Sequence, residues 1–286
     1  MIKNIISLLG KIKKELKNFT DIGVIGLSGG ADSTLVAVLC MLALGKKNVY
    51  GVHMPYSKED YVNYNERSQK LAEYINIKHS FIPIGLGTFS LSENIRNSVI
   101  EEEINISDLN LGNMKARMRM LILYTINQAL SEKYVDKKCR VIGTGNLSED
   151  FIGYATKWGD LAVDINPIGE LFKSEVYQLL DFFKDNIFDE NMNAWMEIKN
   201  IPGAIGLIEE EHIDRIPSAG LWEGQTDEKE LGYTYDEMEP AVKHLYEPDF
   251  DKTLQGTVVE FVEQRHWANE HKVERVPVIN VRKFCD

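Results

Sequence analysis

The chain has 286 residues and a formal net charge of −12 at pH 7. This length allows a hydrophobic core that needs no disulfide or metal, and the negative charge argues against nucleic-acid binding, which requires clustered Lys and Arg. The three cysteines, at positions 40, 139 and 285, form no CxxC or Cys/His metal spacing, so we expect a reduced, cytoplasmic compartment.

The amino-terminal segment, residues 1–19, repeats apolar residues at helical spacing and interrupts them with lysines. We expect an amphipathic surface helix, because the longest uncharged run is too short for a secretory leader. A helix that lies on a membrane surface is the alternative. Nowhere does the sequence approach the run of about 18 apolar residues that a membrane span needs.

Predicted strands and helices alternate through the first half of the sequence. The strands cover residues 22–27, 48–54, 79–84 and 140–144, and the helices cover residues 33–44, 59–75 and 112–130. This alternation predicts an α/β fold, a doubly wound and mainly parallel sheet flanked by helices. Ligands bind at the carboxyl ends of the strands in such sheets, so we expect the functional residues just after each strand.

The second half is less regular. Helices are predicted over residues 173–184, 235–245 and 253–270, and residues 217–226 form a loop without periodicity. No internal repeat or interdomain linker is evident. We therefore expect a single domain over residues 1–286, in which the segment around 185–216 is an insertion or lid.

The most informative motif follows the first predicted strand and reads SGGADS over residues 28–33. It lies between a strand and a helix, where backbone N–H groups and the helix dipole favour an anion. Its glycines allow the backbone to approach a phosphate closely, and its serines can donate hydrogen bonds. Asp32 would repel a bare phosphate, so we interpret it as a Mg²⁺ ligand. The alternative is a plain turn capped by Ser33.

This motif resembles the pyrophosphate loop of the N-type ATP pyrophosphatases, a Rossmann-like superfamily that adenylates its substrates. Three further segments resemble the NAD synthetase family within it. Residues 112–120 read GNMKARMRM, residues 143–167 contain GTGNLSE, GYATKWGD and DINP, and residues 217–228 read PSAGLWEGQTDE. The resemblance extends from about residue 22 to residue 277.

The resemblance implies an ammonia-dependent NAD synthetase, a ligase that forms a C–N bond in NAD biosynthesis. ATP would adenylate the carboxylate of deamido-NAD with release of pyrophosphate, and ammonia would then displace AMP to give NAD. Glutamine-using members carry a separate amidase domain, for which there is no length before residue 22. We therefore expect free ammonia, or ammonia from a partner glutaminase, and a homodimer.

The resemblance also implies site residues. The expected ATP site consists of Ser28, Gly29, Gly30, Asp32, Ser33, His53, Thr144, Lys173 and Ser218. The expected deamido-NAD site consists of Asn113, Arg117, Lys157, Asp164, His271 and Lys272. Asp32 and Glu149 would hold Mg²⁺, Lys173 would contact the phosphates, and Asp160 would take a proton from ammonium.

Three positions depart from the family pattern, and two other functions stay open. His53 and Val273 stand where members carry arginine, and Leu109 where some carry phenylalanine. The chain could adenylate a different carboxylate, although a tRNA substrate would favour basic patches that the sequence lacks. It could also be a catalytically silent nucleotide sensor, but a sensor has little need for the acids Asp32, Glu149 and Asp160.

Overall fold

The computed structural model describes residues 1–57, 65–98, 106–185, 208–214, 216–218, 220, 224–247, 253–274 and 277. Within these ranges no helix is both long enough and apolar enough to cross a membrane. The predicted insertion or lid at 185–216 falls largely outside the described residues, as does the start of the predicted helix 59–75.

A sheet of four parallel strands forms the centre of the molecule. The strands are β1 (Ile22–Gly26), β2 (Val49–His53), β3 (Lys78–Phe81) and β4 (Cys139–Ile142), in the spatial order β3-β2-β1-β4. The chain therefore leaves β1 in one direction for β2 and β3, and β4 lies on its other side. Such a reversal next to β1 creates a crevice at the carboxyl ends of the strands, and it confirms the predicted doubly wound α/β fold.

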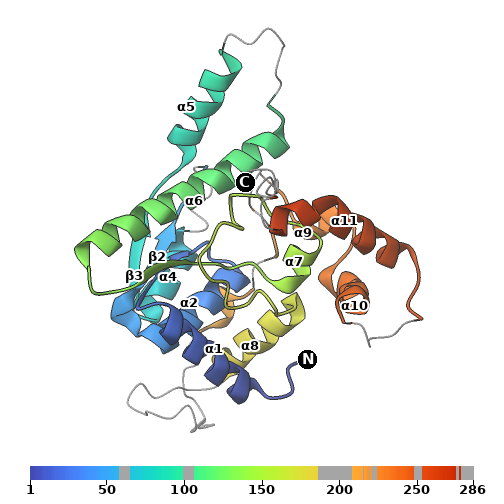
Figure 1. The fold of residues 1–286 in the computed structure, drawn as a ribbon, viewed down its shortest axis with the longest axis horizontal. Helices are drawn as coiled ribbons and strands as arrows, with labels where there is room; N and C mark the ends of the chain where they lie inside the picture. Colours follow the sequence, from blue (N-terminus) through green and yellow to red (C-terminus); the bar gives the residue numbers. More distant parts are fainter. Residues whose placement is uncertain are drawn as a thin grey trace, which may run out of the picture.

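Helices cover both faces of this sheet (Figure 1). One face carries α2 (Ala31–Leu44), α4 (Asn65–Tyr74) and α8 (Lys173–Asp185), with α1 (Ile5–Phe19) packed on α2. The other face carries α6 (Asp108–Lys133). Because α2 lies between the sheet and α1, it is apolar on all sides. The predicted amphipathic helix at the amino terminus is confirmed, and its buried side consists of Leu9, Ile12 and Leu16.

A second group of helices packs beside the sheet, at the right of Figure 1. It consists of α7 (Leu147–Phe151), α9 (Asp227–Leu231), α10 (Tyr235–Tyr246) and α11 (Thr257–Val273). Their apolar side chains form a separate hydrophobic cluster, which Phe172, the residue before α8, joins to the sheet region. Polar side chains of α10 are thereby brought to the start of α8. Two short 3-10 helices, η1 (Lys46–Asn48) and η2 (Glu210–His212), complete the described elements.

The structure adds a helix that the sequence did not predict, α5 (Gly85–Arg96). Glycine, serine and threonine make up much of α5 and have low helix propensity, so the sequence signal for this helix was weak. The long helix α6 begins earlier than the predicted residue 112, because the side chain of Ser107 caps it by accepting the N–H of Asn110.

Candidate active site

A cavity of about 760 Å³ opens at the carboxyl ends of β1, β2 and β4. Its walls come from the turn after β1, the segment that follows β4, one side of α6, the end of α11, residues 216–218 and Gly220. This volume lies within the range of about 300–1,000 Å³ that is usual for small-molecule sites. The crevice predicted from the strand order is therefore a real cavity.

The SGG turn forms one end of this cavity. Gly29 adopts a left-handed conformation, with φ +76°, which a residue with a β-carbon rarely takes. The turn is tied together by its hydroxyl groups, since Ser28 Oγ and Ser33 Oγ are 3.0 Å apart and Ser33 Oγ donates to the carbonyl of Gly30. Gly30 is followed directly by α2, so the positive end of the helix dipole lies at the turn. Both features favour a bound anion.

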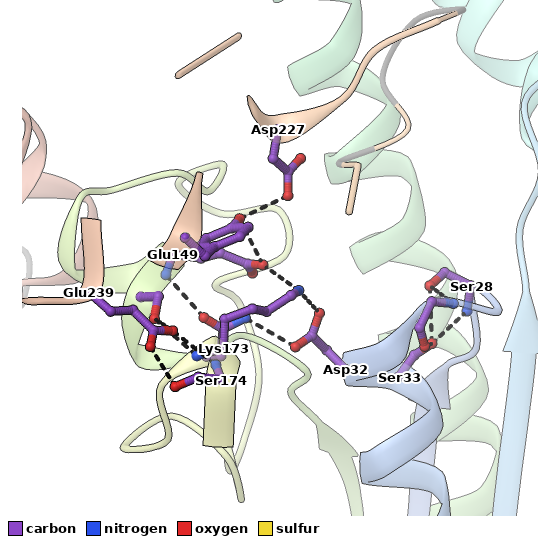
Figure 2. A network of polar contacts seen from close by, with 12 residues as sticks. Ser28, Asp32, Ser33, Glu149, Lys173, Ser174, Asp227 and Glu239 are labelled. Carbon is purple, nitrogen blue, oxygen red and sulfur yellow. Dashed lines mark hydrogen bonds and ion pairs between the residues drawn. The ribbon is translucent and has the colours of Figure 1, made fainter. Parts of the chain in front are cut away.

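Lys173 lies between two carboxylates at the centre of the site (Figure 2). Its Nζ is 2.6 Å from Oδ2 of Asp32 and 3.0 Å from Oε1 of Glu149. Asn146 holds both acids, because its side chain donates to Asp32 Oδ1 and accepts the N–H of Glu149. Three separate parts of the chain thus meet here: the start of α2, the start of α7 after β4, and the start of α8.

Burial and charge oppose each other in this cluster. Burial raises the pKa of the Glu149 carboxyl to about 7, with the charges of Asp32 and Asp227 adding to the rise and Lys173 opposing it. Burial alone would lower the pKa of Lys173, but the two adjacent carboxylates outweigh it and raise the pKa above its ordinary value. Lys173 therefore stays charged, whereas the protonation of Glu149 depends on which cations are near.

Two residues of the α9–α10 region extend the cluster. The hydroxyl of Tyr235 lies 2.8 Å from Oδ2 of Asp227 and 3.3 Å from Oε1 of Glu149. Asp227 is buried at the first position of α9, and the Lys173 ammonium lies over the Tyr235 ring at 5.4 Å from its centre. The helical group beside the sheet therefore contributes directly to the polar centre.

The opposite wall presents several polar and basic groups. Thr156 donates its hydroxyl to Asn113 and its N–H to Asp160, at 2.7 and 2.8 Å. Arg117 donates to the carbonyl of Lys157. Asp160 faces the cavity and is exposed to it, while desolvation by the surrounding protein raises the pKa of its carboxyl above the ordinary value. A raised pKa makes this carboxylate a better proton acceptor than an ordinary aspartate.

The carboxyl-terminal helix α11 closes this wall. Lys272 Nζ donates to the carbonyl of Gly153 at 2.8 Å, and Lys157 Nζ donates to the carbonyl of His271. These two contacts cross between α11 and the segment after β4. Both lysines and His271 line the cavity.

Most of the predicted site residues lie together around this cavity. Those that line it are Ser28, Gly30, Asp32, Ser33, His53, Asn113, Arg117, Thr144, Glu149, Lys157, Asp160, Lys173, Ser218, His271 and Lys272. Within this set Ser218 Oγ donates to the carbonyl of Gln225, and His53 Nδ1 lies 3.1 Å from the carbonyl oxygen of Leu27. Their roles as ligands of ATP or deamido-NAD stay predictions.

Gly29 and Asp164 are not among the residues that line the cavity. Gly29 shapes the turn from within. Asp164 accepts the N–H of Val141 at 2.8 Å and the hydroxyl of Tyr124 at 3.3 Å, so its carboxylate holds the chain against β4. A contact between Asp164 and deamido-NAD stays a prediction, and these bonds give the residue a structural task.

Four residues of the polar centre were not predicted as site residues: Asn146, Asp227, Tyr235 and Glu239. Asn146 had a usable signal, because it follows β4 and caps α7 with its side chain. Tyr235 and Glu239 are four residues apart on α10 and so lie on one side of that helix. Nothing in the sequence of α10 indicates that this side meets α8.

Comparison with known proteins agrees with the predicted resemblance. The sequence model of a family described as NAD synthase matches residues 2–276. An NH3-dependent NAD(+) synthetase from Campylobacter jejuni is 33% identical over 273 residues, which is 94% of this chain and 95% of that protein. An enzyme of the same name from Methanosarcina mazei is 36% identical over 261 residues, with 89% and 88% covered.

Two solved structures are similar over almost the whole chain. An NMN synthetase from Francisella tularensis has a TM-score of 0.70 and 28% identity, with 96% of both chains covered. The NH3-dependent NAD synthetase from Campylobacter jejuni, in complex with the nitrate ion, has a TM-score of 0.63 and 26% identity with the same coverage. The similarity thus includes the sheet and the helical group that builds the cavity walls.

Proposed function

This chain belongs to the NAD synthase family, and we propose that its cavity performs the ATP-dependent amidation of deamido-NAD with ammonia. The protein is accordingly a ligase that forms a C–N bond, with ATP as co-substrate. The observation that carries the assignment of the site is the Lys173 ammonium between Asp32 and Glu149, next to the SGG turn. A triphosphate needs such a combination of positive charge, metal ligands and backbone donors.

The reaction has two steps. The carboxylate oxygen of deamido-NAD attacks the α-phosphorus of ATP, the bond to the β-phosphate oxygen breaks, and pyrophosphate leaves. Ammonia then attacks the acyl carbon, AMP leaves with the electron pair of the C–O bond, and the nitrogen loses a further proton to give the amide. Adenylation is needed because a free carboxylate has no leaving group for ammonia to displace.

The SGG turn and the start of α2 would bind the pyrophosphate portion of ATP. Ser28, Ser33 and the backbone at Gly29 and Gly30 supply donors there, and the dipole of α2 adds positive potential. Lys173 would neutralise phosphate charge from the other side, joined by Ser218. His53 and Thr144, at the ends of β2 and β4, would contact the nucleoside.

Asp32 and Glu149 would hold Mg²⁺. Their carboxylate oxygens already converge on one cation, the Lys173 ammonium, and oxygen ligands suit this metal. Magnesium usually keeps several waters and is bound through one or two carboxylates together with substrate phosphates. When bound, Mg²⁺ supplies positive charge that offsets charge on the departing pyrophosphate.

The wall formed by α6 and α11 would bind deamido-NAD. Asn113, Arg117, Lys157, His271 and Lys272 provide hydrogen-bond donors and positive charge for its phosphates and ribose. Asp160 would take a proton from ammonium, because only uncharged ammonia has a lone pair for attack. Desolvation by the surrounding protein assists Asp160, because it makes the carboxylate a stronger base than an ordinary aspartate.

The proposal includes a homodimer that forms through α5 and α6. Large apolar side chains of these two helices are exposed: Leu86, Phe89, Leu91 and Ile95 of α5, and Leu121 of α6. The helices pack against each other, and α5 projects from the body of the molecule (Figure 1). Exposed apolar surface of this extent is typical of a protein interface. A glutaminase partner that supplies ammonia, and a location in the cytoplasm, stay predictions.

A second acceptor has support from one comparison. The solved structure with a TM-score of 0.70 is named NMN synthetase, so the carboxylate of nicotinate mononucleotide is a rival substrate for the same chemistry. The two acceptors share the nicotinate and ribose phosphate, and they differ by the adenylate portion. Their relative kcat/KM values in one assay decide which of the two this chain uses.

The deciding experiment measures NAD and pyrophosphate formed from ATP, Mg²⁺, deamido-NAD and ammonium chloride. We expect equal amounts of both products. In Asp32→Ala the rate of NAD formation should fall at least about 100-fold, because the Mg²⁺ that Asp32 would hold acts directly on the transition state. Asp136→Ala, which changes an exposed acid far along the chain, is the matched control. ATP binding without pyrophosphate release from any acceptor would contradict the assignment and favour a nucleotide sensor.

A further inference from the structure

Glu239 is a buried acid that lies outside the cavity wall and has no part in the reaction described above. It belongs to α10, in the helical group beside the sheet. Only 4% of its surface is exposed. Burial of a carboxylate costs free energy unless hydrogen bonds compensate it, so the partners of Glu239 show what the residue does.

The three groups that donate to Glu239 all belong to residues next to Lys173 or Glu149 in the sequence (Figure 2). Oε1 accepts the backbone N–H of Ser174 at 2.9 Å and the hydroxyl of Ser148 at 3.0 Å. Oε2 accepts the hydroxyl of Ser174. Ser174 directly follows Lys173, and Ser148 directly precedes Glu149.

A continuous chain of hydrogen bonds links Lys173 to Glu239. The backbone N–H of Lys173 donates to Ser148 Oγ at 3.0 Å, and Ser148 Oγ donates onward to Glu239. Both serines are therefore oriented by one carboxylate. The first N–H groups of α8 have no partner within that helix, and a negative charge at a helix start is favourable. Glu239 thus locks the first turn of α8 to the start of α7, which carries Glu149.

We propose that Glu239 is a positioning residue for amide formation, which fixes the Lys173 ammonium against Glu149 and Asp32 by anchoring the backbone on both sides of the cluster. This inference rests on the proposed function, because Lys173 and Glu149 act on ATP there. Tyr235 lies one turn earlier on the same side of α10 and contacts Glu149 directly. Helix α10, in the helical group beside the sheet, therefore determines the positions of Lys173 and Glu149.

The first test compares Glu239→Gln with Glu237→Gln. Glutamine keeps the size of residue 239 but removes its negative charge, and the bond with the Ser174 hydroxyl must reverse, so that the amide N–H₂ donates to Ser174 Oγ. We expect kcat to fall at least about tenfold with the KM of ATP changed less than about threefold, as for a small displacement of reacting groups. Glu237 caps the same helix at an exposed position, so its variant lowers helix stability without touching the cluster and should keep kcat within about twofold of the parent.

A double-mutant cycle tests the route of the effect. Ser174→Ala removes one donor to Glu239 and should lower kcat, whereas Ser174→Thr keeps the hydroxyl and should retain it. Because the two residues act through one contact, Ser174→Ala should cause little further loss in the Glu239→Gln background. Two results would overturn the inference. One is that the losses in kcat from Ser174→Ala and Glu239→Gln multiply in the double variant, and the other is that Glu239→Gln folds and has the kcat of the parent.

A readout without substrates separates this inference from the proposed function. Acetylation of Lys173 by acetic anhydride, followed by mass spectrometry, reports how well the two carboxylates hold the amine. We expect the labelling rate of Lys173 to rise several-fold in Glu239→Gln and to stay unchanged in Glu237→Gln. If Lys173 is labelled at the same rate in the parent, Glu239→Gln and Glu237→Gln, the inference is wrong, whether or not the parent makes NAD. If the parent makes no NAD, only the proposed function is contradicted.

Discussion

At the scale of single residues, Lys173 shows how a buried charge is kept. Its side chain is 5% exposed, and the carboxylates on either side of it are 19% and 18% exposed. Three charges that are this little exposed are held by direct Coulomb attraction, which is stronger there than at the surface. Removing the central cation would leave two partly buried carboxylates with hydrogen bonds from Asn146 and Tyr235 but without a countercharge.

We therefore expect Lys173→Met to abolish NAD formation and to lower the free energy of unfolding by about 3 kcal/mol. Lys184→Met is the matched control, because Lys184 also bridges two acids, Asp181 and Glu210, but both are largely exposed. Its loss should cost less than about 1 kcal/mol. Urea titrations without Mg²⁺ measure both values, and equal losses would contradict this account of the cluster.

At the scale of elements, α11 is seated by contacts with the segment that follows α7. Gly153 has φ +63°, and a β-carbon there would overlap Cβ and Cγ of Asn269 on α11. The carbonyl of Gly153 also accepts from Lys272. This close approach of backbone to helix requires glycine, and it brings the end of α11 to the cavity.

Gly153→Ala should displace α11 and destabilise the protein by more than the strain of its left-handed backbone, which is about 1 kcal/mol. Gly232→Ala separates the two effects, because Gly232 has φ +78° and open space where its β-carbon would stand. We expect a clearly larger drop in melting temperature for Gly153→Ala, together with a raised KM for deamido-NAD. A similar drop in both variants would show that α11 does not pack as described.

The 3-10 helix η2 depends on a neutral histidine. His212 is 2% exposed, its Nδ1 accepts the N–H of Glu209 at 3.0 Å, and its ring packs on Tyr74. Burial lowers the pKa of His212, with Lys70 and Arg67 acting in the same direction and Glu211 and Glu209 opposing them. The protonated ring could not accept this hydrogen bond.

Because the folded-state pKa of His212 lies below that of the unfolded chain, near 6.5, the unfolded state binds the proton more readily. The stability from this residue is present above about pH 6.5 and is lost as the pH falls through the lowered pKa. His212→Asn, which keeps an acceptor near Nδ1, should flatten the fall in melting temperature between pH 7.5 and 5.5. His244→Asn serves as the control, and unchanged slopes in both would refute the role of His212.

At the scale of the whole molecule, the exposed apolar surface of α5 and α6 predicts self-association. Leu86 is 82% exposed and Phe89 is 56% exposed, on a helix that projects beyond the sheet region. Water contact with side chains of this size is unfavourable by about 25 cal/mol per Å². A second copy would bury this surface.

The double variant Leu86→Glu, Phe89→Glu should therefore be monomeric and still folded, because neither side chain belongs to the core. Val135→Glu is the control, since Val135 is 81% exposed but lies beyond the end of α6. Light scattering coupled to size-exclusion chromatography gives the masses. A parent that is monomeric at micromolar concentration, or a double variant that still dimerises, would contradict the homodimer.

The sequence predicted the convergence of side chains best where the residues follow a strand directly. Asp32 and Glu149 each come soon after a parallel strand, so their convergence at one edge of the sheet could be inferred from the order of strands and helices alone. Asp164 illustrates the limit, because its motif implies a contact with deamido-NAD, which stays a prediction, and gives no sign that the carboxylate also bonds Val141 and Tyr124. A motif identifies the residue but does not show which neighbour its side chain reaches.

The sequence by itself determined the alternation of strands and helices, the SGG turn and the family, since each depends on residues close together in the chain. Only the tertiary structure decided that α10 reaches the start of α8 and that Tyr235 and Glu239 support Lys173. It also decided that burial raises the pKa of Glu149 to about 7. The physical reason is that burial and contacts between distant segments arise from the packing of whole hydrophobic clusters, which no local pattern of residues specifies.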